Sequence, residues 1–258
     1  MCELLGVNSA RDVRMNDYLA EFYTHCDKNP HGWGLALFRE SGVSIEKEPV
    51  CASRSRYLRE RLNADIEGKK MFAHIRLATM GAMVYDNAHP FVRTDQSGRT
   101  WTLVHNGTLF HFPAADHFFY EQRGETDSER ILLYLVDHMN EEIDRAGRPL
   151  TAEERFQVLD KIVCLMAEGN KLNLMIDDGE LMYFHTNYEG TLHVSEHDGT
   201  AVFSTYPLKN GTDWKPVPFT QLFAYRDGKM CYKGTVHGNE YKDNAEDTKF
   251  LFVNYAEL

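Results

Sequence analysis

The sequence lacks the features that mark membrane-spanning, exported and nucleic-acid-binding proteins. It has no apolar run approaching the roughly 20 residues that a membrane-spanning helix needs. Its first residues contain no basic stretch followed by an apolar core, so no signal peptide is expected. The formal net charge of -11 leaves no excess of positive charge for binding nucleic acid. We therefore expect a cytoplasmic protein that has neither a membrane nor a nucleic acid as its partner.

Cysteine is scarce and irregularly placed. The 5 cysteines are odd in number, and no two of them stand in a Cys-x-x-Cys spacing. This pattern favours free thiols in a reducing compartment over a disulfide framework or a zinc finger. The chain shows no internal repeat and no linker, and its 43% of hydrophobic residues suffices for a sizeable core. We expect a single domain over residues 1–258.

The order of apolar patterns predicts strands, then helices, then further strands. Helical spacing occurs over residues 13–25, 53–62 and 152–168, and another helix is expected to begin with Thr126 or Asp127 as its cap. Strand patterns occupy residues 3–7, 33–39, 44–50, 71–76, 101–105, 172–176, 181–185, 202–205, 221–226 and 229–233. Residues 250–253 are expected to form a docked tail. Such an order is typical of an α+β fold with antiparallel sheets.

The first two residues, Met1-Cys2, are compatible with an N-terminal nucleophile. An initiator methionine before a small residue is usually removed, which would leave Cys2 with both a thiol and a free α-amine. The amine, with a reference pKa of about 7.7–8.0, can take the thiol proton directly or through one water. A cysteine at position 2 can equally have no catalytic role, so the assignment depends on the rest of the chain.

Four short stretches follow one another in the order that a known enzyme family shows. They are Cys2, His74-Ile75-Arg76-Leu77-Ala78-Thr79-Met80-Gly81, His105-Asn106-Gly107 and Gly124-Glu125-Thr126-Asp127-Ser128-Glu129, with Asn87-Ala88-His89-Pro90 between the second and the third. From Cys2 to about Ile131 the chain resembles the glutaminase domain of class II glutamine amidotransferases, which are N-terminal-nucleophile hydrolases. The opening Met-Cys-Glu-Leu-Leu-Gly is similar to the stand-alone YafJ-like branch. That branch is similar to enzymes that cleave γ-glutamyl bonds in thiol peptides. The resemblance implies a four-layer αββα sandwich, with two antiparallel sheets between helical layers.

The resemblance also implies the chemistry. Cys2 would attack the carbonyl of a γ-glutamyl amide, the α-amine would carry the proton to the leaving amine, and water would hydrolyse the thioester. Asn106 and the backbone N–H of Gly107 would stabilise the oxyanion; taken alone, the pair is also compatible with a plain Asn-Gly turn. No metal and no organic cofactor is implied.

Four further residues are candidates for binding the small-molecule substrate. The guanidinium fork of Arg76 suits the substrate α-carboxylate, and Thr79 could donate to the same group. Asp127 would receive the α-ammonium, and His89 would line the site or play a structural role. Alternative roles are a surface arginine, a loop hydroxyl and a helix cap.

Two departures keep rival functions open. Leu77 and Met80 stand where synthase members usually carry a tryptophan and a histidine, which puts plain glutamine specificity in question. No synthase or sugar-isomerase sequence follows the glutaminase pattern. The alternatives are a γ-glutamyl peptide hydrolase acting on a thiol peptide, a glutaminase subunit that delivers ammonia to a separate acceptor or synthase protein, and an inactive binding module. A zinc protein built on His74, His89, His105 and a cysteine is a further alternative, although no metal-ligand spacing supports it.

Overall fold

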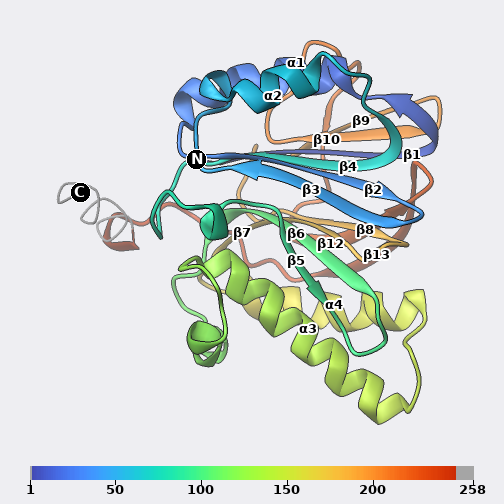
Figure 1. Cartoon of the computed structure of the whole chain (residues 1–258). Coiled ribbons are helices and arrows are strands. Elements are labelled where there is room, and N and C mark those ends of the chain that lie inside the picture. The colour runs from blue at the N-terminus through green and yellow to red at the C-terminus, as the bar shows by residue number, and fades with distance from the viewer. Residues whose placement is uncertain (1, 248–258) are drawn as a thin grey trace.

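The elements form four layers in the order helix, sheet, sheet, helix (Figure 1). The structure is a computed structural model that describes residues 2–247 of the chain. The αββα architecture expected from the sequence is confirmed. None of the helices in residues 2–247 is long and apolar enough to cross a membrane.

The first sheet has seven strands, and every neighbouring pair is antiparallel. In spatial order they are β11 (Lys215–Pro216), β9 (His193–His197), β10 (Thr200–Ser204), β1 (Glu3–Arg14), β4 (Glu67–Ile75), β2 (Trp33–Arg39) and β3 (Gly42–Glu48). Its outer face is covered by α1 (Asn16–Tyr23) and α2 (Arg56–Leu62). The strand that begins next to Cys2 therefore lies in the interior of this sheet.

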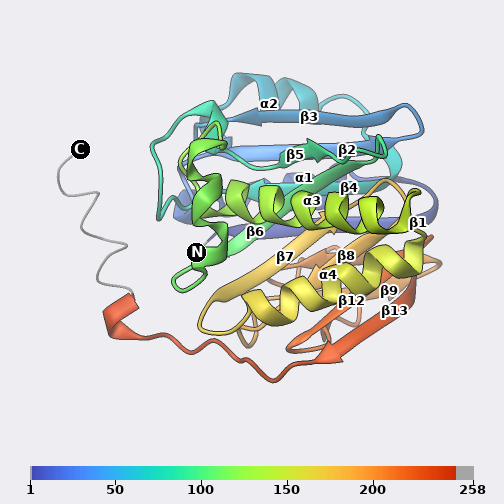
Figure 2. The ribbon, with the colours of Figure 1, turned by 90° about the horizontal axis from the view of Figure 1, so that it is seen from below.

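The second sheet has six antiparallel strands. In spatial order they are β13 (Lys229–Val236), β12 (Gln221–Arg226), β8 (Met182–His185), β7 (Lys171–Asp177), β6 (Thr100–Thr108) and β5 (Phe91–Thr94). The long helices α3 (Asp127–Ala146) and α4 (Ala152–Met166) cover its outer face (Figure 2). Short 3₁₀ helices complete the chain: η1 (Thr24–Lys28), η2 (Ala52–Arg54), η3 (Tyr85–Asn87) and η4 (Pro113–Tyr120).

Three apolar clusters separate the layers, because alternate residues of a strand point to opposite faces of its sheet. In β1, Leu5 and Val7 pack under α1, whereas Leu4 belongs to the cluster between the two sheets. In β6 and β7, Val104 and Met175 belong to that same inter-sheet cluster. Cys2, two residues before Leu4, therefore lies on the side of β1 that faces the second sheet.

Most predicted elements are present, with informative differences at their ends. The strand predicted over residues 101–105 continues to Thr108, because Asn106 and Gly107 pair with Asn173 and Leu172 of β7. The interpretation of Asn106-Gly107 as a plain turn is therefore wrong. The helix predicted from residue 13 begins at Asn16, since β1 runs on to Arg14. The predicted tail over residues 250–253 lies outside the described residues.

Candidate active site

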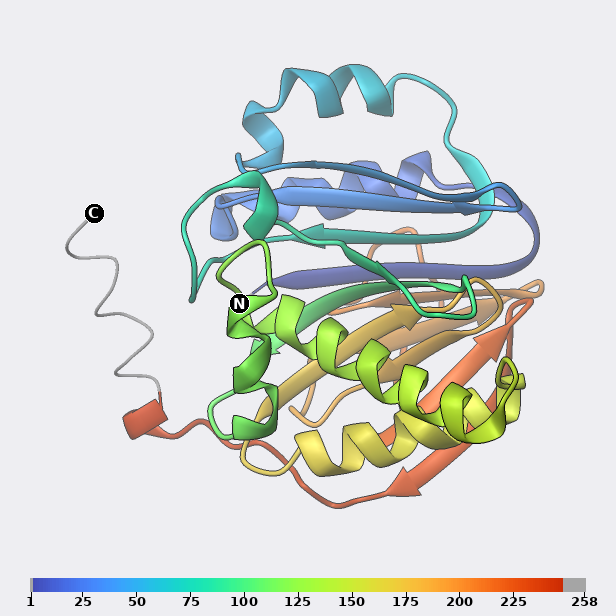
Figure 3. The same cartoon turned by 60° about the horizontal axis from the view of Figure 1, so that its bottom comes forward.

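Cys2 is held at the start of β1 by the contacts of Glu3, which follows it, and of Leu77, which lies beside it. The carboxylate of Glu3 accepts from Asn29 Nδ2 (3.2 Å) and lies 2.7 Å from His25 Nδ1. The backbone N–H of Leu77 donates to Cys2 Sγ (3.3 Å), and Sγ lies 3.4 Å from the carbonyl oxygen of the same residue. The thiol is thus fixed beside the chain that leaves β4. Figure 3 shows that the N-terminal end of the chain lies at the same end of the sandwich as the start of α3.

Burial is the main reason why the pKa of the Cys2 thiol lies above its usual value. The Leu77 N–H and the positive charge of Arg76 act in the opposite direction, and the negative charge of Asp127 raises the pKa further. The thiol is accordingly protonated at neutral pH and needs a base before it can act as a nucleophile. The same contributions place a guanidinium and a carboxylate, both predicted substrate ligands, within electrostatic reach of Cys2.

Arg76 fixes the loop that follows β4. Its side chain is buried and donates to the carbonyl oxygens of Met80 (2.7 Å), Gly81 (3.2 Å) and Ala82 (3.0 Å). Thr79 lies in this loop, partly exposed. Arg76 is therefore not a surface arginine, and its first role is to shape the loop that carries Thr79.

The same loop has two further anchors that the sequence did not reveal. His31 Nδ1 accepts from the N–H of Ala78 (3.0 Å). Glu125 accepts from Ala82 N–H (2.8 Å) and Asn87 Nδ2 (3.0 Å), while Asn87 Oδ1 accepts from the N–H of Glu125 (2.7 Å). Asn87 and Glu125 stand inside two of the stretches that carry the family resemblance, which was the only signal for them. Together these bonds join the loop to the segment before α3.

Asn106 and Gly107 lie side by side in β6, at the edge of the site. Asn106 is buried, and within residues 2–247 its Nδ2 has no hydrogen-bond partner. Gly107 must lack a side chain, because a Cβ there would overlap the carbonyl oxygen of Lys171. A buried amide donor without a partner next to a side-chain-free backbone position is what an oxyanion site requires.

Asp127 is the first residue of α3 and is buried. Its Oδ2 accepts from the N–H of Leu109 (2.8 Å), and its Oδ1 accepts from the N–H of Ser128 (2.9 Å). The helix cap is Thr126, whose hydroxyl accepts from Glu129 N–H (3.3 Å). The alternative in which Asp127 is the cap is therefore wrong, and its carboxylate is stabilised by the positive end of the helix dipole.

His89 is buried against His74, with ring centroids 4.1 Å apart, and against Phe91 at 4.7 Å. Neither ring nitrogen of His89 has a partner in the part of the chain that the structure describes. Burial holds the pKa of His89 well below its usual value and lowers that of His74 to about 3. Both imidazoles are neutral at physiological pH and are poor candidates for the base that Cys2 needs.

The three histidines of the zinc hypothesis do not form a metal site. Over residues 2–247, the group of three close metal-ligating atoms is Cys26, Asp27 and Cys51. His105 instead bonds Ser128 Oγ through Nδ1 (2.9 Å). The zinc alternative built on these histidines is therefore wrong.

Comparisons with known proteins agree with this geometry. The sequence matches the family of class-II glutamine amidotransferases over residues 1–197. The chain belongs to this family. It is similar to two proteins that carry the name "putative glutamine amidotransferase": one from Haemophilus influenzae, 29% identical over 89% of this chain and 85% of that protein, and YafJ of Escherichia coli, 28% identical over 84% and 94%. Membership of the family supports an enzyme activity on glutamine.

The solved structures show the same fold at low sequence identity. Glutamine phosphoribosylpyrophosphate amidotransferase of Bacillus subtilis is 16% identical and superposes with a TM-score of 0.63, covering 89% of this chain and 48% of that chain. The chain therefore shares the fold of this amidotransferase. The family match ends at residue 197, yet β12 and β13 continue the second sheet beyond that point.

Leu77 and Met80, the two residues that differ from the synthase members of the family, contact the site through their backbone atoms. Leu77 meets Cys2 through its backbone N–H and carbonyl, and Met80 meets Arg76 through its carbonyl. The loop geometry is thus compatible with the replacement of both side chains.

A wide hollow of about 1010 Å³ lies at the opposite end of the sheets from Cys2. It is lined by the turns between β2 and β3, β5 and β6, and β7 and β8, and includes Lys70, Arg99 and Asp177. None of the predicted site residues lines it, so its size alone does not make it the active site.

Proposed function

We propose that the protein hydrolyses the γ-amide of glutamine, or of a γ-glutamyl amide, through a thioester on Cys2. The observation that carries this proposal is the position of the Cys2 thiol, held by Leu77 within reach of opposite charges on Arg76 and Asp127. A zwitterionic amino-acid head group needs such a pair, with the guanidinium for its carboxylate and the carboxylate for its ammonium. Thr79 and His89 complete the proposed pocket.

In the proposed reaction, Cys2 acts after Met1 has been removed. The new α-amine accepts the thiol proton, and Sγ attacks the amide carbonyl carbon. Asn106 Nδ2 and the Gly107 N–H stabilise the resulting oxyanion. The amine then returns the proton to the departing nitrogen, which leaves as ammonia or as an amine. Water hydrolyses the thioester, releasing glutamate and restoring the thiol.

The wider expectations from the sequence stay proposals. They are the single domain over residues 1–258, the cytoplasmic location, and the alternative in which ammonia passes to a separate acceptor or synthase protein. The continuation of the second sheet through β12 and β13 supports the single domain.

Release of the N-terminus tests the function directly. Glutamine hydrolysis would be compared for protein that retains an N-terminal tag, for protein cleaved so that Cys2 comes first, and for Cys2→Ala. We expect turnover only in the cleaved wild-type protein, because only there does one residue carry both the Cys2 thiol and a free α-amine. Full turnover with the tag in place would show that another group is the base.

A further inference from the structure

Lys171 and Asn173 of β7 face the same space as Cys2. Asn173 stands directly opposite Asn106 in the β6–β7 pairing, and Lys171 stands opposite Thr108. Both lie an even number of residues from Met175, which packs between the sheets. Two polar residues from the second sheet therefore extend the row that begins with Asn106.

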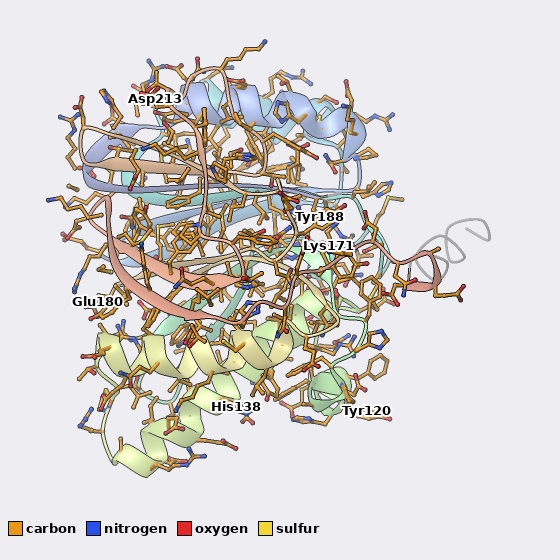
Figure 4. All side chains as sticks on the ribbon, turned by 180° about the vertical axis from the view of Figure 1, so that it is seen from behind. Tyr120, His138, Lys171, Glu180, Tyr188 and Asp213 are labelled. Atoms are coloured by element: carbon orange, nitrogen blue, oxygen red, sulfur yellow. The ribbon has the colours of Figure 1, made fainter. Side chains whose placement is uncertain are left out.

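The ammonium of Lys171 is held in a defined place. It lies 3.5 Å from the ring centroid of Tyr188 and 5.7 Å from that of Tyr241. Figure 4 shows Lys171 beside Tyr188. The hydroxyl of Tyr188 donates to Asp243, and the backbone N–H of Tyr241 donates to Asn187 O (2.8 Å), so both rings are themselves anchored. Such cation–π contacts help to hold the ammonium in place.

This lysine also lies within the electric field of the nucleophile. Burial lowers the pKa of Lys171 to about 8, while the charges of Asp243 and of ionised Cys2 act to raise it. The side chain therefore carries a positive charge on most molecules at neutral pH. Lys171 is only 8% exposed. Folding therefore removes most of the water around its ammonium group, which costs free energy.

Asn173 adds a buried donor. Its Oδ1 accepts from the hydroxyl of Thr186 (2.5 Å), but its Nδ2 has no partner anywhere in residues 2–247. A buried amide in this condition normally has a functional explanation. The site thus contains one cation and one amide donor beyond Arg76, Asn106 and Gly107, and the departing ammonia of glutamine needs neither.

We propose that Lys171 and Asn173 form the leaving-amine side of the site and select γ-glutamyl amides whose departing amine bears a carboxylate, as in a γ-glutamyl dipeptide. This inference rests on the proposed function. The ammonium of Lys171 pairs with the carboxylate of the departing residue, and Asn173 Nδ2 donates to it. Because glutamine has no such group, the protein prefers a γ-glutamyl peptide to glutamine.

The test compares three substrates that share the γ-glutamyl half: glutamine, γ-glutamylglycine and γ-glutamylglycinamide. The last two differ only in the carboxylate, so the ratio of their kcat/KM values reports its recognition. We expect wild type to favour γ-glutamylglycine roughly 10- to 100-fold, as the loss of a hydrogen bond to a charged group implies. Lys171→Met should bring the ratio close to one, Lys171→Arg should retain part of it, and Asn173→Ala should lower it in part.

The exposed Lys161 of α4 provides the matched control. Lys161→Met removes an equal charge from an exposed position on α4, which covers the outer face of the second sheet, and should leave the ratio as in wild type. Turnover of all three substrates with a wild-type ratio near one, or a ratio that Lys171→Met does not change, would overturn this inference alone. Absence of turnover on every substrate would overturn the proposed function as well. If Lys171→Met does not fold, the wild-type ratio and Lys171→Arg still decide the question.

Discussion

Asn106 carries a buried side-chain amide with no partner for its Nδ2 in the described part of the chain. Such a donor costs stability unless a ligand uses it. Asn8 has the same property: it is fully buried, its Oδ1 accepts from Gly228 N–H (2.6 Å), and its Nδ2 has no partner over the same residues. The two residues differ in position, because Asn8 pairs with Lys70, at the end of the sheets away from Cys2.

Asn106→Ala should lower kcat by roughly 10²- to 10³-fold while changing KM little, because an oxyanion forms only after attack. Steady-state kinetics on glutamine would measure both constants. Asn8→Ala serves as the control and should lower the free energy of unfolding without a comparable loss of kcat. Equal losses of kcat in the two variants would remove Asn106 from the reaction.

The pH dependence of kcat/KM should identify the base. The raised pKa of Cys2 and the lowered pKa values of His74 and His89 leave the α-amine, with a reference pKa of about 7.7–8.0, as the group that must lose its proton. Activity should therefore fall about tenfold per pH unit below that value and stay level above it.

Two lysines near the site also have pKa values of about 8, Lys47 and Lys171, in both cases mainly through burial. The acidic limb of the profile should persist in Lys47→Met and in Lys171→Met, since neither is the proposed base. A limb centred near pH 6.5 would instead indicate a histidine.

Helix α3 brings Asp127 to the site through its first turn, and Thr126 caps that turn. Helix α4 begins in the same way, with Thr151 and Glu154 forming a capping box. Both helices are thus capped by a threonine. Only α3 has a predicted site residue, Asp127, in its first turn.

Thr126→Ala and Thr151→Ala should each lower the free energy of unfolding by about 1 kcal/mol, measured by urea denaturation. Only Thr126→Ala should also raise KM, because Asp127 loses its fixed position when the first turn frays. If the two variants show the same KM, the start of α3 does not position the substrate.

The elements themselves followed well from the sequence, and the reasons are local. Alternation and helical spacing placed β2, α4 and the strand pairs β7–β8 and β12–β13, since each depends on residues close in the chain. The extension of β6 through Asn106 and Gly107 could not be predicted locally, because it depends on pairing with β7, some 65 residues later. Lys171 was missed for the same reason, as an isolated lysine at a strand start gives no signal until β6 and β7 are paired.

At the scale of the whole molecule, a buried ion pair between Lys70 and Asp177 joins the two sheets at the end opposite Cys2. Lys70 of β4 donates to Asp177 Oδ2 of β7 (2.6 Å) and to the carbonyl oxygen of Gly179 (2.9 Å). Asp177 is almost fully buried, and burial raises its pKa despite the nearby ammonium. Removing the lysine alone would leave a buried carboxylate without its counter-charge.

Lys70→Met should therefore lower the free energy of unfolding by about 3–5 kcal/mol, and adding Asp177→Asn should recover part of that loss. Urea unfolding of the two variants would measure the difference. Molecules that remain folded should keep kcat and KM, because the active site lies at the other end of the sheets. A loss below about 1 kcal/mol in Lys70→Met would show that the pair contributes little to holding the sheets together.

The central claim is that Cys2, as the first residue of the active protein, is the nucleophile. The most direct measurement is the intact mass of the protein after reaction with a glutamine analogue that carries a diazo ketone at the γ position, followed by peptide mapping. We predict a chain that lacks Met1 and carries one adduct on Cys2, with labelling slowed by excess glutamine and absent in Cys2→Ala. Labelling of Cys26, Cys51, Cys164 or Cys231 in place of Cys2, or glutamine turnover by a chain that retains Met1, would contradict the account.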